Sequence, residues 1–224
     1  MKKFFKAYKL YMKTSFSPIM TIFCSFMCIG LFFAAFASPE KSSSKEYLSM
    51  IGVIGMGHLF IFLNFIMGIF STRNHKFFMS TESAKKLYTV VPMVSTLTVC
   101  LIYDIIMYVV AYFAWDSAGK SDILIVNALG TFFACLTASS SYMSKLEAVS
   151  IIGYFFMTFQ SVLYKAIGLN GGFGLEQGTA AIIAIIIYIA GISLNVIMME
   201  LWWNKSGRNF NKNNISVGYQ MLGK

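Results

Sequence analysis

The sequence predicts an all-α membrane protein with six transmembrane helices, an amphipathic interfacial helix before the first span, and both termini in the cytoplasm. Hydrophobic residues make up 57% of the 224 residues and charged residues only 12%, about half the roughly 25% of a soluble domain. The apolar residues form continuous runs, whereas a transmembrane β-barrel alternates apolar and polar positions over about ten residues. Only 3 prolines interrupt the chain, which favours long helices.

Six apolar runs are long enough to cross the hydrocarbon core, which takes about 20 residues of helix. Pro18 stands near the start of the first run, where a helix tolerates proline. The fourth run gives the weakest of the six predictions. Together they form a transmembrane domain over 17–201, with spans at about 17–37, 48–70, 90–114, 122–140, 148–168 and 179–201.

The first run also has features of a secretory signal peptide, because a basic segment precedes an apolar one. Its length of about 21 residues exceeds the 7–15 residues of a usual signal core. Ser38 and Pro39, which follow the run, make a poor cleavage site. We therefore expect the first run to be a retained helix.

Lys and Arg are distributed unevenly between the two sides of the predicted bundle. Fourteen of them lie on the side that holds both termini, and four lie on the other side: Lys41, Lys45, Lys120 and Lys165. Basic residues concentrate on the cytoplasmic side of membrane proteins. We therefore expect both termini in the cytoplasm, and we attribute the net charge of +9 to topology rather than to a nucleic-acid partner.

Residues 1–16 predict a basic amphipathic helix on the cytoplasmic surface. At about 100° per residue, aromatic side chains such as Phe4, Tyr8 and Tyr11 fall on one face. The basic face comprises Lys2, Lys6, Lys9 and Lys13. Such a helix suits the membrane interface, and the alternative is a basic N-terminus without regular structure.

The longest cytoplasmic connection runs from residue 71 to residue 89. A structureless loop of that length is uncommon and often functional. The Ser-Thr pair at 80–81 can cap a short helix. That helix would present Lys85 and Lys86 to the cytoplasm. It would turn Leu87 and Tyr88 inward.

Two further segments carry no helical periodicity. The cytoplasmic tail 202–224 is rich in Asn, Lys and Gly, and Trp202 and Trp203 at its start are typical of an interfacial anchor. The outer connection 168–178 is rich in glycine. It is either a short re-entrant turn or a plain loop.

The sequence lacks the motifs that would indicate an enzyme. No Gly-rich loop ends in Gly-Lys-Ser/Thr, the string whose amides and lysine bind nucleotide phosphates, and neither HExxH nor GxSxG occurs. Two histidines are too few for a histidine metal site, and the four cysteines stand in apolar runs without zinc spacing. We therefore predict no catalytic residue, no metal ligand and no cofactor bound by this chain.

Asp104 is the most distinctive polar residue in the predicted spans. A charge in mid-span is costly, so such a residue faces the bundle interior or a cavity. Asp104 and His58, on the second span, both lie about ten residues from the outer ends of their helices, about 15 Å deep. Because these spans are sequential and antiparallel, we predict that the two residues pair. The pair is either a clamp between helices, which we favour, or a proton relay or substrate contact.

The predicted architecture resembles the permease subunit of type-2 ABC exporters in its short bacterial form. The number of spans, the early amphipathic helix and the long connection after the second span match, and ESAKKLYTVVPMVSTL (82–97) is the most similar string. In that family this region forms a coupling helix that docks on a separate ATPase. The resemblance implies partner contacts by Glu82, Lys85, Lys86, Leu87 and Tyr88, with a minor contact at 139–148.

The resemblance implies a permease in the bacterial cytoplasmic membrane that exports a peptide or a small amphiphile. ATP and Mg²⁺ would bind to the ATPase subunit, and the permease would pair with an identical or a different permease. The best-known members have helical re-entrant segments where this chain has only 168–178. Two other functions stay open: a non-transporting membrane protein, such as a bacteriocin immunity or assembly factor, and a secondary transporter, for which the spans hold few ionisable groups.

Overall fold

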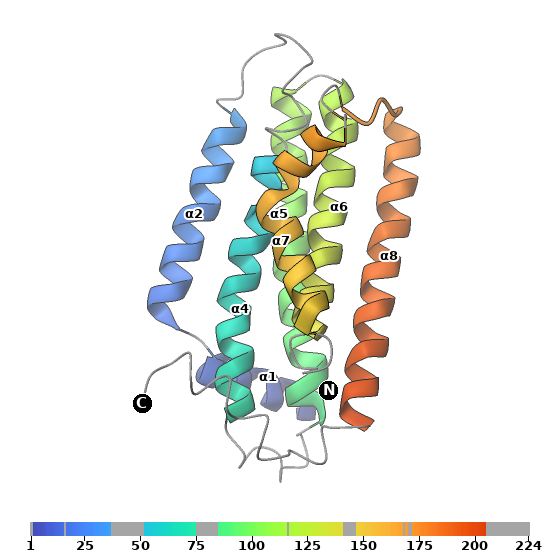
Figure 1. Ribbon diagram of the computed structural model, residues 1–224. Helices are drawn as coiled ribbons and strands as arrows, with labels where there is room; N and C mark the ends of the chain where they lie inside the picture. The colour runs from blue at the N-terminus through green and yellow to red at the C-terminus, as the bar shows by residue number, and fades with distance from the viewer. Residues whose placement is uncertain are drawn as a thin grey trace.

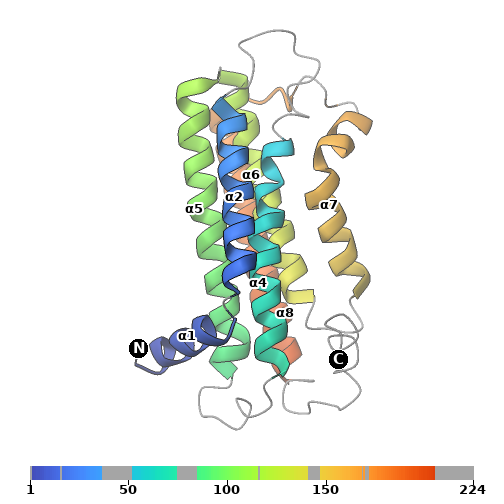
Figure 2. The same cartoon turned by 90° about the vertical axis from the view of Figure 1, so that its left-hand side faces the viewer.

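The computed structural model describes residues 2–15, 17–36, 52–74, 85–115, 117–140, 147–167, 169 and 172–204. Within these residues all regular structure is helical, which confirms the predicted fold class for this part of the chain. Six helices run along the bundle, and α1 (Lys2–Ser15) lies across one end of it (Figure 1; Figure 2). The lengthwise helices are α2 (Pro18–Phe36), α4 (Gly57–Asn74), α5 (Val91–Ala114), α6 (Ser117–Ser140), α7 (Glu147–Ala166) and α8 (Gln177–Trp202).

Three helices in the described part of the chain are long and apolar enough to cross a membrane: Lys86–Ala114, Ala118–Ser140 and Gln177–Trp202. A fourth span results if α1 and α2, which meet at 92°, count as one bent segment. Several long apolar helices fit a multi-pass membrane protein, as the composition predicts. The chain is also helical at the other predicted spans, in α2, α4 and α7, whose assignment as membrane spans stays a prediction.

Two helices begin earlier than predicted. α6 starts at Ser117 rather than near residue 122. Asp122 is therefore part of the helix, and its Oδ1 accepts a 3.0 Å hydrogen bond from Phe173 N–H. The helix of the third span starts with a π-helical turn, η2 (Lys86–Val90), that leads directly into α5. Part of the predicted cytoplasmic connection is therefore an extension of the third span.

The second predicted span is not continuous. Residues 52–55 are helical, the chain turns at Met56, and α4 then runs to Asn74. The turn leaves carbonyl groups without helical partners, and side chains satisfy two of them: Tyr103 Oη donates to Ile54 O at 2.6 Å, and His58 Nδ1 lies 2.8 Å from Gly55 O. Irregular backbone at membrane depth is tolerated where protein groups bond to it in this way.

α6 is the central helix of the bundle and packs against α4, α5, α7 and α8. Of its most apolar stretch 72% is buried, against 33% for α5 and 28% for α8. A helix surrounded by protein can carry polar side chains that bond to its neighbours, so its sequence needs less hydrophobicity than a helix that faces lipid. This explains why the fourth span gave the weakest prediction.

α5 and α8 each expose a broad apolar face on the outside of the helical bundle. Ile105 and Phe113 on α5 are 63% and 79% exposed, and Ile182 and Ile189 on α8 are 61% and 59% exposed. A soluble protein rarely leaves such continuous apolar surface in water. These faces fit contact with lipid.

At one end of the bundle α1 packs against the start of the third span. Its Ala7 and Tyr11 are each 1% exposed, and Leu87 and Tyr88 of η2 belong to the same buried cluster. The opposite face of α1 carries exposed lysines. The predicted amphipathic helix is therefore present, and its location in the membrane interface stays a prediction.

The four predicted interfacial lysines all stand on α1, and three have described side chains, which are exposed: Lys6, Lys9 and Lys13. Lys2 is part of the helix, and its side chain lies outside the described residues. Trp202 and Trp203, predicted as an interfacial anchor, are only 5% and 9% exposed. The prediction is wrong about what surrounds the two indoles. Both pack inside the protein, in the buried cluster that contains residues of α1 and η2.

Candidate functional site

Asp104 lies near the middle of α5 and is 5% exposed. About ten residues separate it from the helix end at Ala114, which places it about 15 Å deep. Cys100 and Met107, one turn away on either side, are 0% and 1% exposed. The carboxylate therefore points into the bundle, as the cost of an isolated charge in lipid predicts.

The structure brings His58 and Asp104 together. His58, in the first turn of α4, is 0% exposed, and its Nε2 lies 2.6 Å from Asp104 Oδ1. Gly130 on α6 makes room for the imidazole, because a Cβ at that position would overlap the ring. The depth argument from the sequence thus agrees with the geometry, while the role of the pair stays a prediction.

The partners of His58 fix how many protons the pair holds. A carbonyl oxygen only accepts, so Nδ1 carries a proton and donates it to Gly55 O, 2.8 Å away. A second proton lies between Nε2 and Asp104 Oδ1, on the nitrogen of an imidazolium or on the oxygen of a carboxylic acid. In both cases the pair is neutral overall. Net neutrality lowers the desolvation penalty that an isolated ion would have in the bilayer.

Two hydroxyl groups complete the shell around the carboxylate. Thr131 Oγ1 on α6 and Tyr188 Oη on α8 donate to Asp104 Oδ2 at 2.7 and 2.8 Å. Asn127 Nδ2 on α6 donates to the Asp104 backbone oxygen at 3.2 Å. The network therefore ties α4, α5, α6 and α8 together at one level of the bundle.

The sequence alone did not single out Thr131 or Tyr188. Tyr188 is the one polar side chain in the run AIIAIIIYIAG (181–191), and Thr131 follows Asn127 by one helical turn. Such isolated polar residues mark helix faces that meet other polar groups. A search for them would have found the candidates, and only the packing shows that they meet at Asp104.

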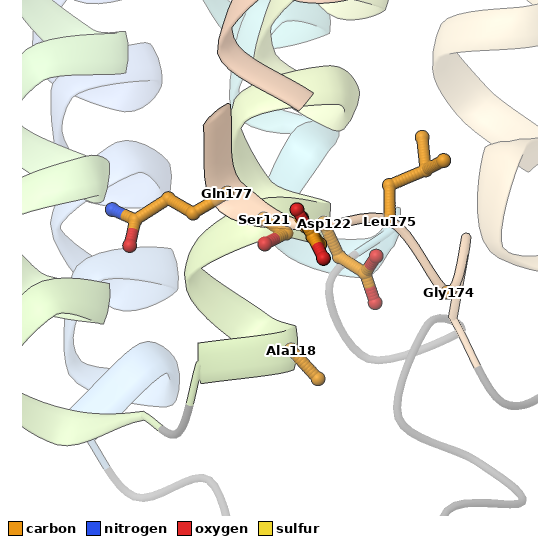
Figure 3. Close-up of a pocket in the computed structure, with 7 residues that line it drawn as sticks. Ala118, Ser121, Asp122, Gly174, Leu175 and Gln177 are labelled. Atoms are coloured by element: carbon orange, nitrogen blue, oxygen red, sulfur yellow. The ribbon is translucent and has the colours of Figure 1, made fainter. Parts of the chain in front are cut away.

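A surface pocket lies away from this network, at the ends of α6 and α8 opposite α1 (Figure 1; Figure 3). It measures about 390 Å³ and is lined by Ala118, Ser121, Asp122, Gly174, Leu175, Glu176 and Gln177. Gln177 Nε2 also donates to Tyr108 Oη on α5 at 2.7 Å. Asp104 does not line this pocket, so the buried network and the pocket are separate features.

The predicted ATPase-contact residues divide into two groups. Lys85 and Lys86 are exposed, and Lys85 Nζ forms an ion pair of 2.8 Å with Glu200 Oε2 near the end of α8. Leu87 and Tyr88 are 0% exposed beneath α1. They turn inward as the pattern predicted, and their burial excludes them from direct contact with a partner, which corrects that part of the expected contact set.

Other residues of the expected contact surface lie outside the described part of the chain. Glu82 and the capping pair at 80–81 belong to this group, as do residues 141–146 of the minor contact. Ser139 and Ser140, which begin the minor contact, are both 0% exposed at the end of α6. They are therefore packing residues of that helix end and not surface contacts.

Within the described residues no group of three or more His, Cys, Asp or Glu side chains is placed to hold a metal ion. Comparison with protein-family models, with curated proteins and with solved structures gives no match. The function of the chain therefore has to be argued from its architecture and from the two sites described above.

Proposed function

We propose that this chain is the membrane-spanning permease subunit of an ATP-driven exporter, with ATP hydrolysed by a separate subunit. The observation that carries the proposal is the arrangement at the α1 end. There an amphipathic helix meets α2 at 92° and packs on the first turn of the third span, beside the exposed Lys85 and Lys86. This arrangement supports the resemblance to short type-2 ABC permeases, in which such an end receives the ATPase.

The residues next to Lys86 contact two other helices. Leu87 and Tyr88 pack in one apolar cluster with residues of α1, and Lys85 forms an exposed ion pair with Glu200 of α8. Export requires two global states that bind the substrate with different affinity. In this proposal the partner ATPase favours one state by pushing on the start of the third span.

The same proposal assigns the topology and the assembly. In it the chain has six spans, with α1 and the C-terminal tail in the cytoplasm of a bacterial cell and the spans in the cytoplasmic membrane. ATP and Mg²⁺ belong to the ATPase subunit. A second permease, identical or different, completes the translocation path for a peptide or a small amphiphile.

Purification of the tagged full chain from its native membrane tests the proposal. We expect a stoichiometric ATPase subunit to co-purify. Lys86→Glu should weaken that association and the substrate-stimulated ATPase activity. The matched control is Lys165→Glu, because Lys165 is an exposed lysine at the other end of the bundle, and this change should leave both properties unaltered.

Glu200→Gln distinguishes the effect of the Lys85–Glu200 ion pair from the effect of the partner contact. It removes the ion pair and leaves both lysines in place. We expect it to retain the ATPase subunit. Absence of any ATPase subunit, together with normal activity of Lys86→Glu, would refute the exporter and leave a non-transporting membrane protein as the better candidate.

A further inference from the structure

Polar side chains continue from the Asp104 network toward the α1 end, along the three helices that face one another there. On α5, Thr96 and Cys100 precede Asp104 at intervals of four residues, and on α6, Cys135 and Ser139 follow Thr131 at the same interval. Residues four apart share one helix face. We name this set, with the α8 residue that faces it, the polar seam: Thr96, Cys100, Thr131, Cys135, Ser139 and Asn195.

The seam is closed to the outside of the bundle. Thr96, Cys135 and Asn195 are each 1% exposed, and Cys100 is 0% exposed. Contacts join the helices along it: the Asn195 side chain lies against the Cys135 thiol, and Ser139 Oγ lies 3.5 Å from Met198 Sδ on α8. The seam is therefore an interior feature shared by α5, α6 and α8.

Several buried polar atoms along the seam lack a strong partner. Neither Asn195 Oδ1 nor Asn195 Nδ2 bonds to an oxygen or nitrogen atom of the described residues, and the same holds for Thr96 Oγ1 and the adjacent Ser95 Oγ. Leaving such a group unpaired is destabilising, and native interiors satisfy nearly all of them. Ordered water is the usual partner of buried polar groups that protein atoms leave unsatisfied.

Part of the opposite side of the Asp104 network is apolar. Toward the far end of the bundle Met107, Ala111, Ile123 and Ala184 cover it, and none of them is more than 3% exposed. These side chains offer water no hydrogen bonds, and apolar cavities in proteins stay dry. Asn127 Oδ1 is the exception on that side, since it is buried and has no hydrogen-bond partner among the described residues.

We propose that the polar seam binds ordered water molecules in the interior of the bundle, between α5, α6 and α8 and next to the His58–Asp104 pair. This water is the partner of Thr96 Oγ1 and of both polar atoms of the Asn195 side chain. The inference does not depend on an ATPase partner or on any transported substrate.

Hydroxyl-radical footprinting by X-ray radiolysis of the full chain in lipid nanodiscs tests for this water. Radicals form at bound water, so buried thiols beside water are oxidised while dry thiols are not. We expect oxidation of Cys100 and Cys135 several-fold faster than that of Cys24, a 4% exposed thiol on α2 outside the seam. Equal protection of all three thiols would overturn the proposal.

Two further measurements use the same experiment. Thr96→Val with Asn195→Leu removes the groups that hold the water, and it should lower the oxidation of Cys100 and Cys135 to the level of Cys24. Met198, which contacts Ser139 of the seam, should be oxidised, while Met107, which packs among apolar residues, should be protected. Oxidation of Met107 as fast as that of Met198 would overturn the assignment of the water to the seam.

Discussion

At the scale of single residues, the Asp104 carboxylate is the centre of the buried network, because three side chains donate to or share a proton with its oxygens. Asp104→Leu removes the partner of His58 Nε2 and the acceptor of the Thr131 and Tyr188 hydroxyl groups in the interior. We expect it to lower the free energy of unfolding by about 3–5 kcal/mol, as when one partner of a buried pair is removed. Denaturant unfolding in detergent measures the change.

Asp104→Asn is the matched control for charge. Its amide nitrogen can donate to Nε2 of a neutral His58, and its oxygen can accept from Thr131 and Tyr188, so every hydrogen bond is retained. The expected loss is below about 1.5 kcal/mol, within the net contribution of one hydrogen bond. Loss of transport by Asp104→Asn with stability and assembly intact would count against the clamp and favour a proton relay.

Gly130 tests how tightly the imidazole is enclosed. Gly130→Ala adds a Cβ that overlaps the His58 ring, so we expect destabilisation by about 1–3 kcal/mol, typical of overpacking. Gly30→Ala on α2 is the control, since nothing lies within 4 Å of a Cβ there. Thermal unfolding of both variants in the same lipid should separate them, and equal unfolding temperatures would contradict the described packing.

At the scale of helices, the packing of α1 includes one large buried aromatic side chain. Tyr11 is 1% exposed and belongs to the same buried cluster as Leu87 and Tyr88 of η2, whereas Phe5 of α1 is 63% exposed. Tyr11→Ala leaves a cavity and should weaken the docking of α1 by about 2–5 kcal/mol, the range for large-to-small core changes.

A spin label at the exposed Lys9 reports this docking. Tyr11→Ala should increase the mobility of the label, while Phe5→Ala should leave it unchanged because the Phe5 side chain is 63% exposed. A label equally mobile in both variants would show that α1 is held by lipid rather than by the protein.

At the scale of the whole molecule, the predicted orientation can be tested with two exposed positions at opposite ends of the bundle. Lys165→Cys, in the last turn of α7, should react with a membrane-impermeant maleimide on intact cells. Lys9→Cys on α1 should react only after the membrane is permeabilised. The unsubstituted chain gives the background labelling of its four native cysteines. The reverse labelling pattern would show that the topology is opposite to the predicted one.

Much of the fold was predictable because apolar run length depends on local sequence. The runs at 90–114 and 179–201 lie within helices with the length and composition of membrane spans. Asp104 was predictable as an interior residue because a lone charge in lipid is costly. The break at Met56 was not, since it depends on Tyr103 and His58 satisfying the freed carbonyl groups.

The all-helical class, the approximate positions of the long helices and the common level of His58 and Asp104 follow from the sequence alone. All three depend on hydrophobicity and helix rise, which are properties of one segment at a time. The packing of the helices is needed to show that α6 is central, that Thr131 and Tyr188 complete the shell of Asp104, and that Leu87 is buried. These facts depend on which helix faces meet, and contacts between segments distant in sequence are not encoded in the periodicity of either segment.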